Sequence, residues 1–173
     1  MFACPPFSSL ALRMSCLAIA GLACAGPATA QAQAEQSLCR ADEKVLFACT
    51  TKARLVSICA ARDLAPKAGY VQFRYGSPGS NEMIAWPEAR YPRQDVTRGN
   101  VYLAGTLGRY LRFTMDQTSF VVFSVGGKSS GLVIEHNKVI QKKIICQQTT
   151  VSELKDVPVP LSYVIAVSGQ APD

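Results

Sequence analysis

The sequence contains little of what catalytic and metal-binding sites are usually built from. His136 is its only histidine, and it lies beside the turn residue Asn137, where a solvent-exposed imidazole is the ordinary outcome. We therefore do not expect a histidine-based catalytic triad or a histidine-rich zinc site. The 12 acidic residues are spread thinly, and no pair suited to general acid and base catalysis stands out. We expect a protein without enzymatic activity, cofactor or bound metal.

A phosphate-binding loop is also missing. The segment Gly126–Gly131 has a similar composition, but it lacks the order G-x-x-x-x-G-K-[ST] and no helical pattern follows it. We interpret it as a hairpin loop. The formal net charge of +6 is a modest basic excess, which favours solubility and weak attraction to anionic surfaces. We expect no nucleic acid among the partners.

The first 34 residues differ in composition from the rest of the chain. Arg13 is their only charged residue, and the apolar run Met14–Ala25 follows it. This run is shorter than the ~20 residues that a membrane-spanning helix needs. Together with the small residues that end at Ala30 and Ala34, it predicts a secretory signal peptide over residues 1–34, cleaved after one of these two alanines. The alternative is a lipid anchor at Cys24.

The cysteines indicate the cellular compartment. Three of the seven precede Glu35, and the other four are Cys39, Cys49, Cys59 and Cys146. An even number of cysteines in an exported chain predicts two disulfides. The spacing of the first three is too wide for the short C-x2-4-C pairs of structural zinc sites. We expect a periplasmic or secreted protein that does not span the membrane.

The remaining chain is typical of an all-β protein. Short runs rich in Val, Ile, Phe and Tyr alternate with Gly, Pro, Asn, Asp and Ser. We expect one antiparallel domain of about eight or nine strands over residues 35–168, either a closed barrel or a two-sheet sandwich, and a flexible tail over residues 169–173. Only Ser152–Asp156 is compatible with a helical turn. The predicted strands are Lys44–Thr50, Arg54–Ala61, Tyr70–Tyr75, Glu82–Trp86, Val101–Leu107, Tyr110–Met115, Phe120–Val125, Leu132–His136 and Lys138–Gln147.

The first two of these strands form a predicted hairpin with one cysteine near the end of each. A three-residue loop, Thr51–Ala53, would place Cys49 opposite Leu55 and Cys59 opposite Val45. Both cysteines would then point into the same interior, too far apart along the strands for a disulfide between them.

The long-range disulfide is expected to reach the last predicted strand. Cys146 is the natural partner for Cys49 or Cys59, and Cys39 takes the cysteine that remains. Such a bond would tie the first hairpin to the last strand, which is what closure of a barrel requires.

A long loop is the best candidate for partner binding. The segment Pro87–Asn100 has about 14 residues, beyond the usual loop length of ~4–6. Arginine and aromatic residues are enriched in binding surfaces. We hypothesise that this region contacts an anionic partner, such as a cell-envelope polymer or an acidic protein face. Its candidate residues are Trp86, Arg90, Tyr91, Arg93 and Arg98.

Three other arginines lie in predicted strands beside aromatic residues, namely Arg74, Arg109 and Arg112. Arginine in such strands usually lies on the solvent face with its aliphatic stem packed down. We therefore assign these three no role beyond that.

Four short patterns, taken together, carry a resemblance. They are F-x-C at Phe47–Cys49, S-x-C-A at Ser57–Ala60, Gln72–Gly76, and Gly131–Ile134 before the last cysteine. In these patterns the chain resembles a group of small exported bacterial β-rich proteins of unknown function. The resemblance implies export and a β-rich fold, and it implies no catalytic residues.

We therefore expect a non-enzymatic binding or structural protein of the bacterial cell envelope. The disulfide-tied β format is also loosely similar to that of periplasmic lysozyme inhibitors, a likeness of fold only. The alternative function is accordingly an inhibitor of a cell-wall hydrolase such as lysozyme.

Overall fold

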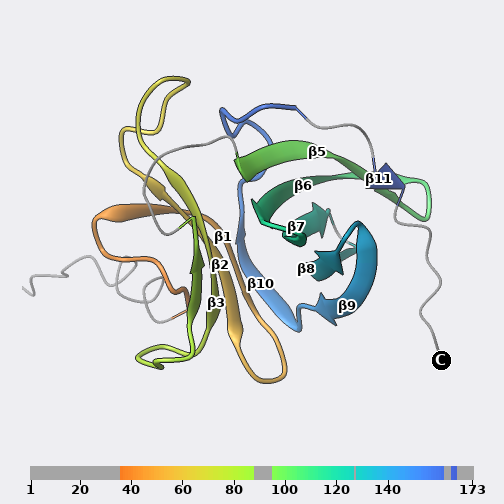
Figure 1. Cartoon of the computed structure of the whole chain (residues 1–173), viewed down its shortest axis with the longest axis horizontal. Helices are drawn as coiled ribbons and strands as arrows, with labels where there is room; N and C mark the ends of the chain where they lie inside the picture. The colour runs from red at the N-terminus through yellow and green to blue at the C-terminus, as the bar shows by residue number, and fades with distance from the viewer. Residues whose placement is uncertain (1–35, 88–94, 127, 162–164, 167–173) are drawn as a thin grey trace, which may run out of the picture.

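The computed structural model describes residues 36–87, 95–126, 128–161 and 165–166. The predicted signal peptide and the predicted tail lie outside these residues. The described chain forms eleven strands in two sheets that pack against each other (Figure 1). Sheet 1 has the order β10-β1-β2-β3-β4, and sheet 2 has the order β11-β5-β6-β7-β8-β9. The strands are β1 (Glu43–Thr50), β2 (Leu55–Ala61), β3 (Val71–Gly76), β4 (Ile84–Trp86), β5 (Val96–Leu103), β6 (Thr106–Met115), β7 (Thr118–Val125), β8 (Ser129–His136), β9 (Val139–Ile145), β10 (Gln148–Ser152) and β11 (Ile165–Ala166).

The all-β fold and the two disulfides confirm the predicted fold class. Of the two predicted architectures, the closed barrel is wrong, because the strands form two sheets. Ten strands pair in antiparallel fashion, and the two-residue β11 pairs with β5 in parallel. The predicted strand Lys138–Gln147 is β9, which ends at Ile145 because the chain leaves sheet 2 at Cys146. A strand that was not predicted, β10, then begins at Gln148 and pairs with β1 at the edge of sheet 1. The two sheets therefore stay separate, and the strand count rises above nine. The predicted helical turn at Ser152–Asp156 is also absent from this described segment.

The main hydrophobic core lies between the two sheets. Phe73 of β3 stacks on Phe120 of β7 with ring centroids 5.0 Å apart, and it contacts Phe113 of β6 at 5.7 Å. Burying large aromatic side chains supplies much of the stabilisation of such a core. The other core residues include Phe47, Val56, Ile58, Leu111, Val122 and Leu132.

The outer face of sheet 2 is apolar as well. A second buried cluster contains Val101, Tyr110, Val121, Phe123, Val125 and Val133. Gly99 lies against the ring of Tyr110, and a Cβ atom at this position would come within 2.5 Å of that ring. This strand position therefore requires glycine for packing.

The register of the first hairpin decides where the disulfides go. Val45 pairs with Cys59 as predicted, but a β-bulge at Leu46 shifts the ladder, and Cys49 pairs with Val56 in place of Leu55. A shift of one residue reverses the face that every following side chain presents. Cys49 therefore faces the core, whereas Cys59 lies on the outer face of sheet 1. The expectation that both cysteines share one interior is wrong.

The disulfides follow from these two faces. Cys49 bonds to Cys146, where the chain crosses from sheet 2 to sheet 1. Cys59 bonds to Cys39, in the segment that precedes β1. Among the described residues no bond joins Cys49 to Cys59, as predicted from their spacing, and this confirms the expectation that Cys146 takes one of the two.

The predicted loop Pro87–Asn100 is shorter in the structure. β5 already begins at Val96, and residues 88–94 lie outside the described part of the chain. The turn after β5 also differs from the prediction, since it lies at Ala104 and Gly105, both with positive φ, and β6 continues through Gly108. Hydrophobic alternation alone does not locate this turn. Among the described residues there is no helix long and apolar enough to cross a membrane.

The segment after β10 packs on the domain. Leu154, Val157 and Val159 are buried in the main core. Arg98 of β5 holds the segment at the edge of sheet 2, since its backbone N–H donates to the carbonyl of Pro160 at 2.9 Å and its side chain donates to the carbonyl of Val159 at 3.2 Å.

The turn between β8 and β9 contains a residue under backbone strain. Asn137 and Lys138 have φ of 51° and 65°, so both turn residues lie in the left-handed region. Two-residue hairpin turns with positive φ at both positions favour Asn-Gly. We expect Lys138→Gly to raise the free energy of unfolding by about 0.5–1 kcal/mol, because glycine adopts this φ without a steric penalty.

Urea denaturation monitored by fluorescence would measure the effect of Lys138→Gly. Lys128→Gly is the matched control, because Lys128 is an exposed turn lysine and is not among the described residues with positive φ. An equal change in the two variants would contradict the strain at Lys138.

Candidate functional site

A buried polar cluster lies on the outer face of sheet 1. The Arg74 guanidinium donates from both terminal nitrogens to the Glu43 carboxylate, at 2.7 and 2.6 Å, and these side chains are 5% and 0% exposed. The Tyr70 hydroxyl donates to the same carboxylate at 2.6 Å, and Gln72 accepts from Arg74 at 2.9 Å. We call these four residues the polar cluster. A bidentate pair with this many partners satisfies both charges.

The segment before β1 covers this cluster. The backbone N–H of Arg40 donates to Glu43 at 2.6 Å, and the carbonyl of Leu38 accepts from Arg74 at 2.6 Å. The backbone N–H of Leu38 donates to the Ser57 hydroxyl at 2.9 Å, and the disulfide from Cys39 fixes the segment to β2. The covering segment and the polar cluster thus hold each other in place.

The polar cluster does not have the chemistry of a metal site or a general base. Cys39, Cys59 and Glu43 place their ligand atoms within 4.8 Å of one another, but the two sulfurs are bonded to each other. Burial by itself would raise the pKa of Glu43. The hydrogen bonds from Arg74, Tyr70 and the Arg40 backbone, together with the charge of Arg74, outweigh this effect and lower the pKa below its ordinary value. Glu43 therefore stays ionised, and its role is structural.

The lowered pKa of Glu43 predicts a pH-dependent stability. A carboxyl group whose pKa is lower in the folded state stabilises the protein fully above its unfolded-state pKa, and this contribution is lost as the pH falls through the folded-state value. We expect the difference in free energy of unfolding between the wild type and Glu43→Gln to be largest near neutral pH. It should narrow below about pH 4.3, the ordinary glutamate pKa.

Urea denaturation at a series of pH values from 7 to 3 would measure this difference. Glu153→Gln serves as the control, since Glu153 is exposed and its ion pair is with the exposed Lys44. If the difference in free energy of unfolding between the wild type and Glu43→Gln stayed constant over the whole pH range, this would contradict a lowered pKa for Glu43.

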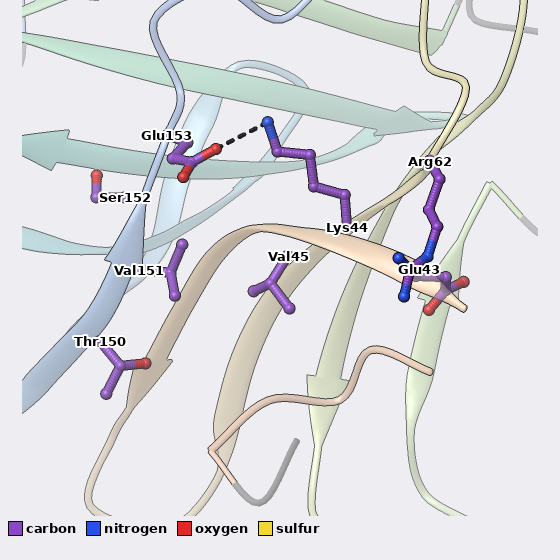
Figure 2. Close-up of a pocket in the computed structure, with 8 residues that line it drawn as sticks. All are labelled: Glu43, Lys44, Val45, Arg62, Thr150, Val151, Ser152 and Glu153. Carbon is purple, nitrogen blue, oxygen red and sulfur yellow. Dashed lines mark ion pairs between the residues drawn. The ribbon is translucent and has the colours of Figure 1, made fainter. Parts of the chain in front are cut away.

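An open groove lies beside the polar cluster, at the edge where β10 meets β1. Its volume is about 680 Å³. Figure 2 shows the side chain of Lys44 extending toward Glu153, with which it forms an ion pair of 2.9 Å, while Arg62 lies at the far side beside Glu43. The lining residues are Glu43, Lys44, Val45, Arg62, Thr150, Val151, Ser152 and Glu153.

A second hollow of about 430 Å³ extends this groove toward the segment after β10. The two hollows share Lys44, Arg62 and Glu153, and the second adds Lys155 and Asp156. We call the two together the sheet 1 groove. Its floor belongs to a sheet that both disulfides fix.

Arg62 is a groove cation that has donors left for a ligand. Its Nη2 donates to the carbonyl of Ala41 at 2.8 Å and its Nε to that of Asp42 at 3.2 Å. These bonds use part of the five N–H donors of a guanidinium and fix its orientation. No described residue accepts from Nη1, and the side chain is exposed.

The structure describes two of the five residues predicted to bind a partner. Trp86 is half-buried against the main core, and its indole N–H donates to the carbonyl of Thr114 at 2.9 Å. Arg98 holds the segment after β10, and a second bond runs to the carbonyl of Lys155 at 3.2 Å. Both side chains have structural contacts. Arg90, Tyr91 and Arg93 lie outside the described residues.

Two of the three strand arginines are not the solvated residues we predicted. Arg74 is 4% exposed, and Arg112 forms an ion pair with the buried Glu135. Alternation gives no signal for the burial of Arg74, because its apolar neighbours Phe73 and Tyr75 lie on the opposite face of β3. Its own face holds Gln72 and Gly76, and a charge buried there needs a partner.

Comparisons with protein-family models, with curated proteins and with solved structures found no match. The function is therefore inferred from the chemistry of the grooves and of the charged clusters.

Proposed function

We propose that the protein is an exported, non-enzymatic binding protein of the bacterial cell envelope, and that it takes an extended anionic polymer along the sheet 1 groove. The observation that carries this proposal is the groove itself, an open, polar channel on a sheet that two disulfides fix. Two disulfides are typical of proteins that fold in an oxidising compartment outside the cytoplasm. A periplasmic or secreted location fits both features.

The charge of the groove favours an anionic ligand. Lys44, Arg62 and Lys155 line it, whereas Glu153 and Asp156 are its two acidic residues that are not buried. The third carboxylate, Glu43, is already neutralised by Arg74. The groove therefore keeps a cationic excess, and the hydroxyl groups of Thr150 and Ser152 add hydrogen-bonding positions beside it.

Among the described residues, the two most deeply buried carboxylates support binding rather than catalysis. Glu43 is paired with Arg74, and Glu135 is paired with Arg112. A general acid or base needs a carboxyl group that exchanges its proton near the working pH. Glu43 is instead held in its ionised form by the guanidinium group of Arg74.

Co-sedimentation with isolated peptidoglycan sacculi tests the proposal. Sacculi are extended and anionic, and they carry hydroxyl and amide groups. We expect the wild type to sediment with them, and we expect Lys44→Gln/Arg62→Gln to weaken the association by about fivefold to tenfold, as the loss of two exposed charge contacts implies.

Lys67→Gln/Lys128→Gln is the matched control, because both lysines are exposed and neither lines the groove. The control variant should bind as the wild type does. Equal binding by all three proteins, or no sedimentation of any of them, would overturn the assignment of the groove.

A further inference from the structure

Strand β9 presents a free edge at the end of sheet 2. β8 pairs with one side of it, and no described strand pairs with the other side. Val139, Ile140 and Ile145 are 61%, 53% and 47% exposed. An edge strand that is long, apolar and exposed offers its unpaired backbone groups to any other extended chain. This edge is separate from the sheet 1 groove and plays no part in the function proposed above.

A cationic cleft accompanies this edge. It has a volume of about 580 Å³ and lies between β9 and the turn of the first hairpin. Lys52, Lys142 and Lys143 line it, and no carboxylate is among its lining residues. Tyr75, Ile144 and Ile145 add apolar surface. The cleft therefore combines backbone pairing with a positive field and apolar contacts.

The position of the lysines argues against a second copy of this chain as the occupant. Antiparallel pairing of β9 with its own copy, centred on the strand, would place Lys142 directly opposite Lys142 of the other molecule. Like charges directly opposite each other destabilise a strand pair. A partner strand with acidic residues at the same positions would gain from the same arrangement.

We propose that the free edge of β9 binds an extended acidic segment of another protein by strand addition. The segment continues sheet 2 through backbone hydrogen bonds, and a pair of adjacent carboxylates meets Lys142 and Lys143, one on each face of the sheet. β-Branched residues on either side pack against the exposed isoleucines of β9.

A fluorescent peptide Val-Thr-Glu-Glu-Thr-Val is a suitable probe, because it places one glutamate on each face. Fluorescence anisotropy should show saturable binding to the wild type. It should show binding about tenfold weaker to Lys142→Glu/Lys143→Glu, in which two attractive pairs become repulsive. The same peptide with lysines in place of both glutamates should not bind.

Two controls separate strand addition from simple charge attraction. The acidic peptide with alternate backbone nitrogens methylated should lose its binding, because it keeps its charge but cannot donate the hydrogen bonds of a ladder. Lys44→Gln/Arg62→Gln should bind the peptide as the wild type does, so failure of the groove proposal would leave this result unchanged.

Three outcomes would overturn the proposal. The first is equal binding of the methylated peptide. The second is no binding of the acidic peptide, in which case the lysines only protect the edge against aggregation. The third is a concentration-dependent dimer in analytical ultracentrifugation that Lys142→Glu/Lys143→Glu changes, which would make a second copy the occupant.

Discussion

Replacing Arg74 by methionine is expected to lower the free energy of unfolding by about 3–5 kcal/mol, the effect of removing one partner from a buried ion pair. The Glu43 side chain is 0% exposed, so the carboxyl group would be left buried without its counter-ion and without water to solvate it. The remaining bonds from Tyr70 and from the Arg40 backbone do not replace a guanidinium. Urea denaturation at neutral pH would measure the loss.

The double variant Glu43→Gln/Arg74→Met sharpens this test. Because it removes both charges, we expect it to be more stable than Arg74→Met alone, and the difference measures the penalty of the unpaired carboxylate. Lys44→Met is the surface control. Lys44 and Glu153 are 53% and 56% exposed, and loss of this pair should cost less than about 1 kcal/mol. Equal losses for Arg74→Met and Lys44→Met would contradict the role of the polar cluster.

Removal of the Cys49–Cys146 disulfide by alanine at both positions is the second large expected effect. The bond closes a loop with a sequence separation of 97 residues. In the chain-entropy model, the loss of such a crosslink destabilises the folded state by about 4–5 kcal/mol. Thermal and urea denaturation of the oxidised protein and of Cys49→Ala/Cys146→Ala would show whether the fold survives without the bond.

The other disulfide provides the comparison. Cys39 and Cys59 are separated by only 20 residues, which corresponds to about 3 kcal/mol in the same model. Cys39→Ala/Cys59→Ala should therefore be the milder variant, although it also loosens the cover of the polar cluster. A larger loss of stability in Cys39→Ala/Cys59→Ala than in Cys49→Ala/Cys146→Ala would contradict this expectation. It would mean that the Cys39–Cys59 bond stabilises the protein mainly through the contacts of the covering segment and not through loop length.

Much of the fold follows from the alternation of residues in the sequence. Alternation and turn residues predicted most of the strands, the hairpin of β1 and β2, and the turn at Asn137. The separation of Cys49 from Cys59 along their strands correctly excluded a bond between them. Alternation did not reveal the bulge at Leu46, because a bulge inserts one residue into a pattern that stays apolar on both sides of it. As a consequence, Cys59 was wrongly predicted to point into the same interior as Cys49.

The candidate sites were harder to predict, and the reason is physical. The partners Glu43 and Arg74 are 31 residues apart, and only the pairing of β1 with β2 and of β2 with β3 brings them together. The sheet 1 groove likewise depends on β10, a polar strand that gives no hydrophobic signal. Its partner β1 is about 100 residues earlier in the chain. Such contacts depend on topology, which residue patterns do not specify.

Because the chain crosses to sheet 1 only at Cys146, sheet 1 is completed late during synthesis of the chain. Sheet 1 begins with β1, yet the neighbour that covers its edge, β10, is among the last strands to be synthesised. Until then the edge of β1 stays unpaired, and Cys49 has no partner for its disulfide. Contacts of such long sequence separation form slowly. A chain that stops before Cys146 therefore exposes the edge of a hydrophobic strand and also leaves Cys49 as a free thiol.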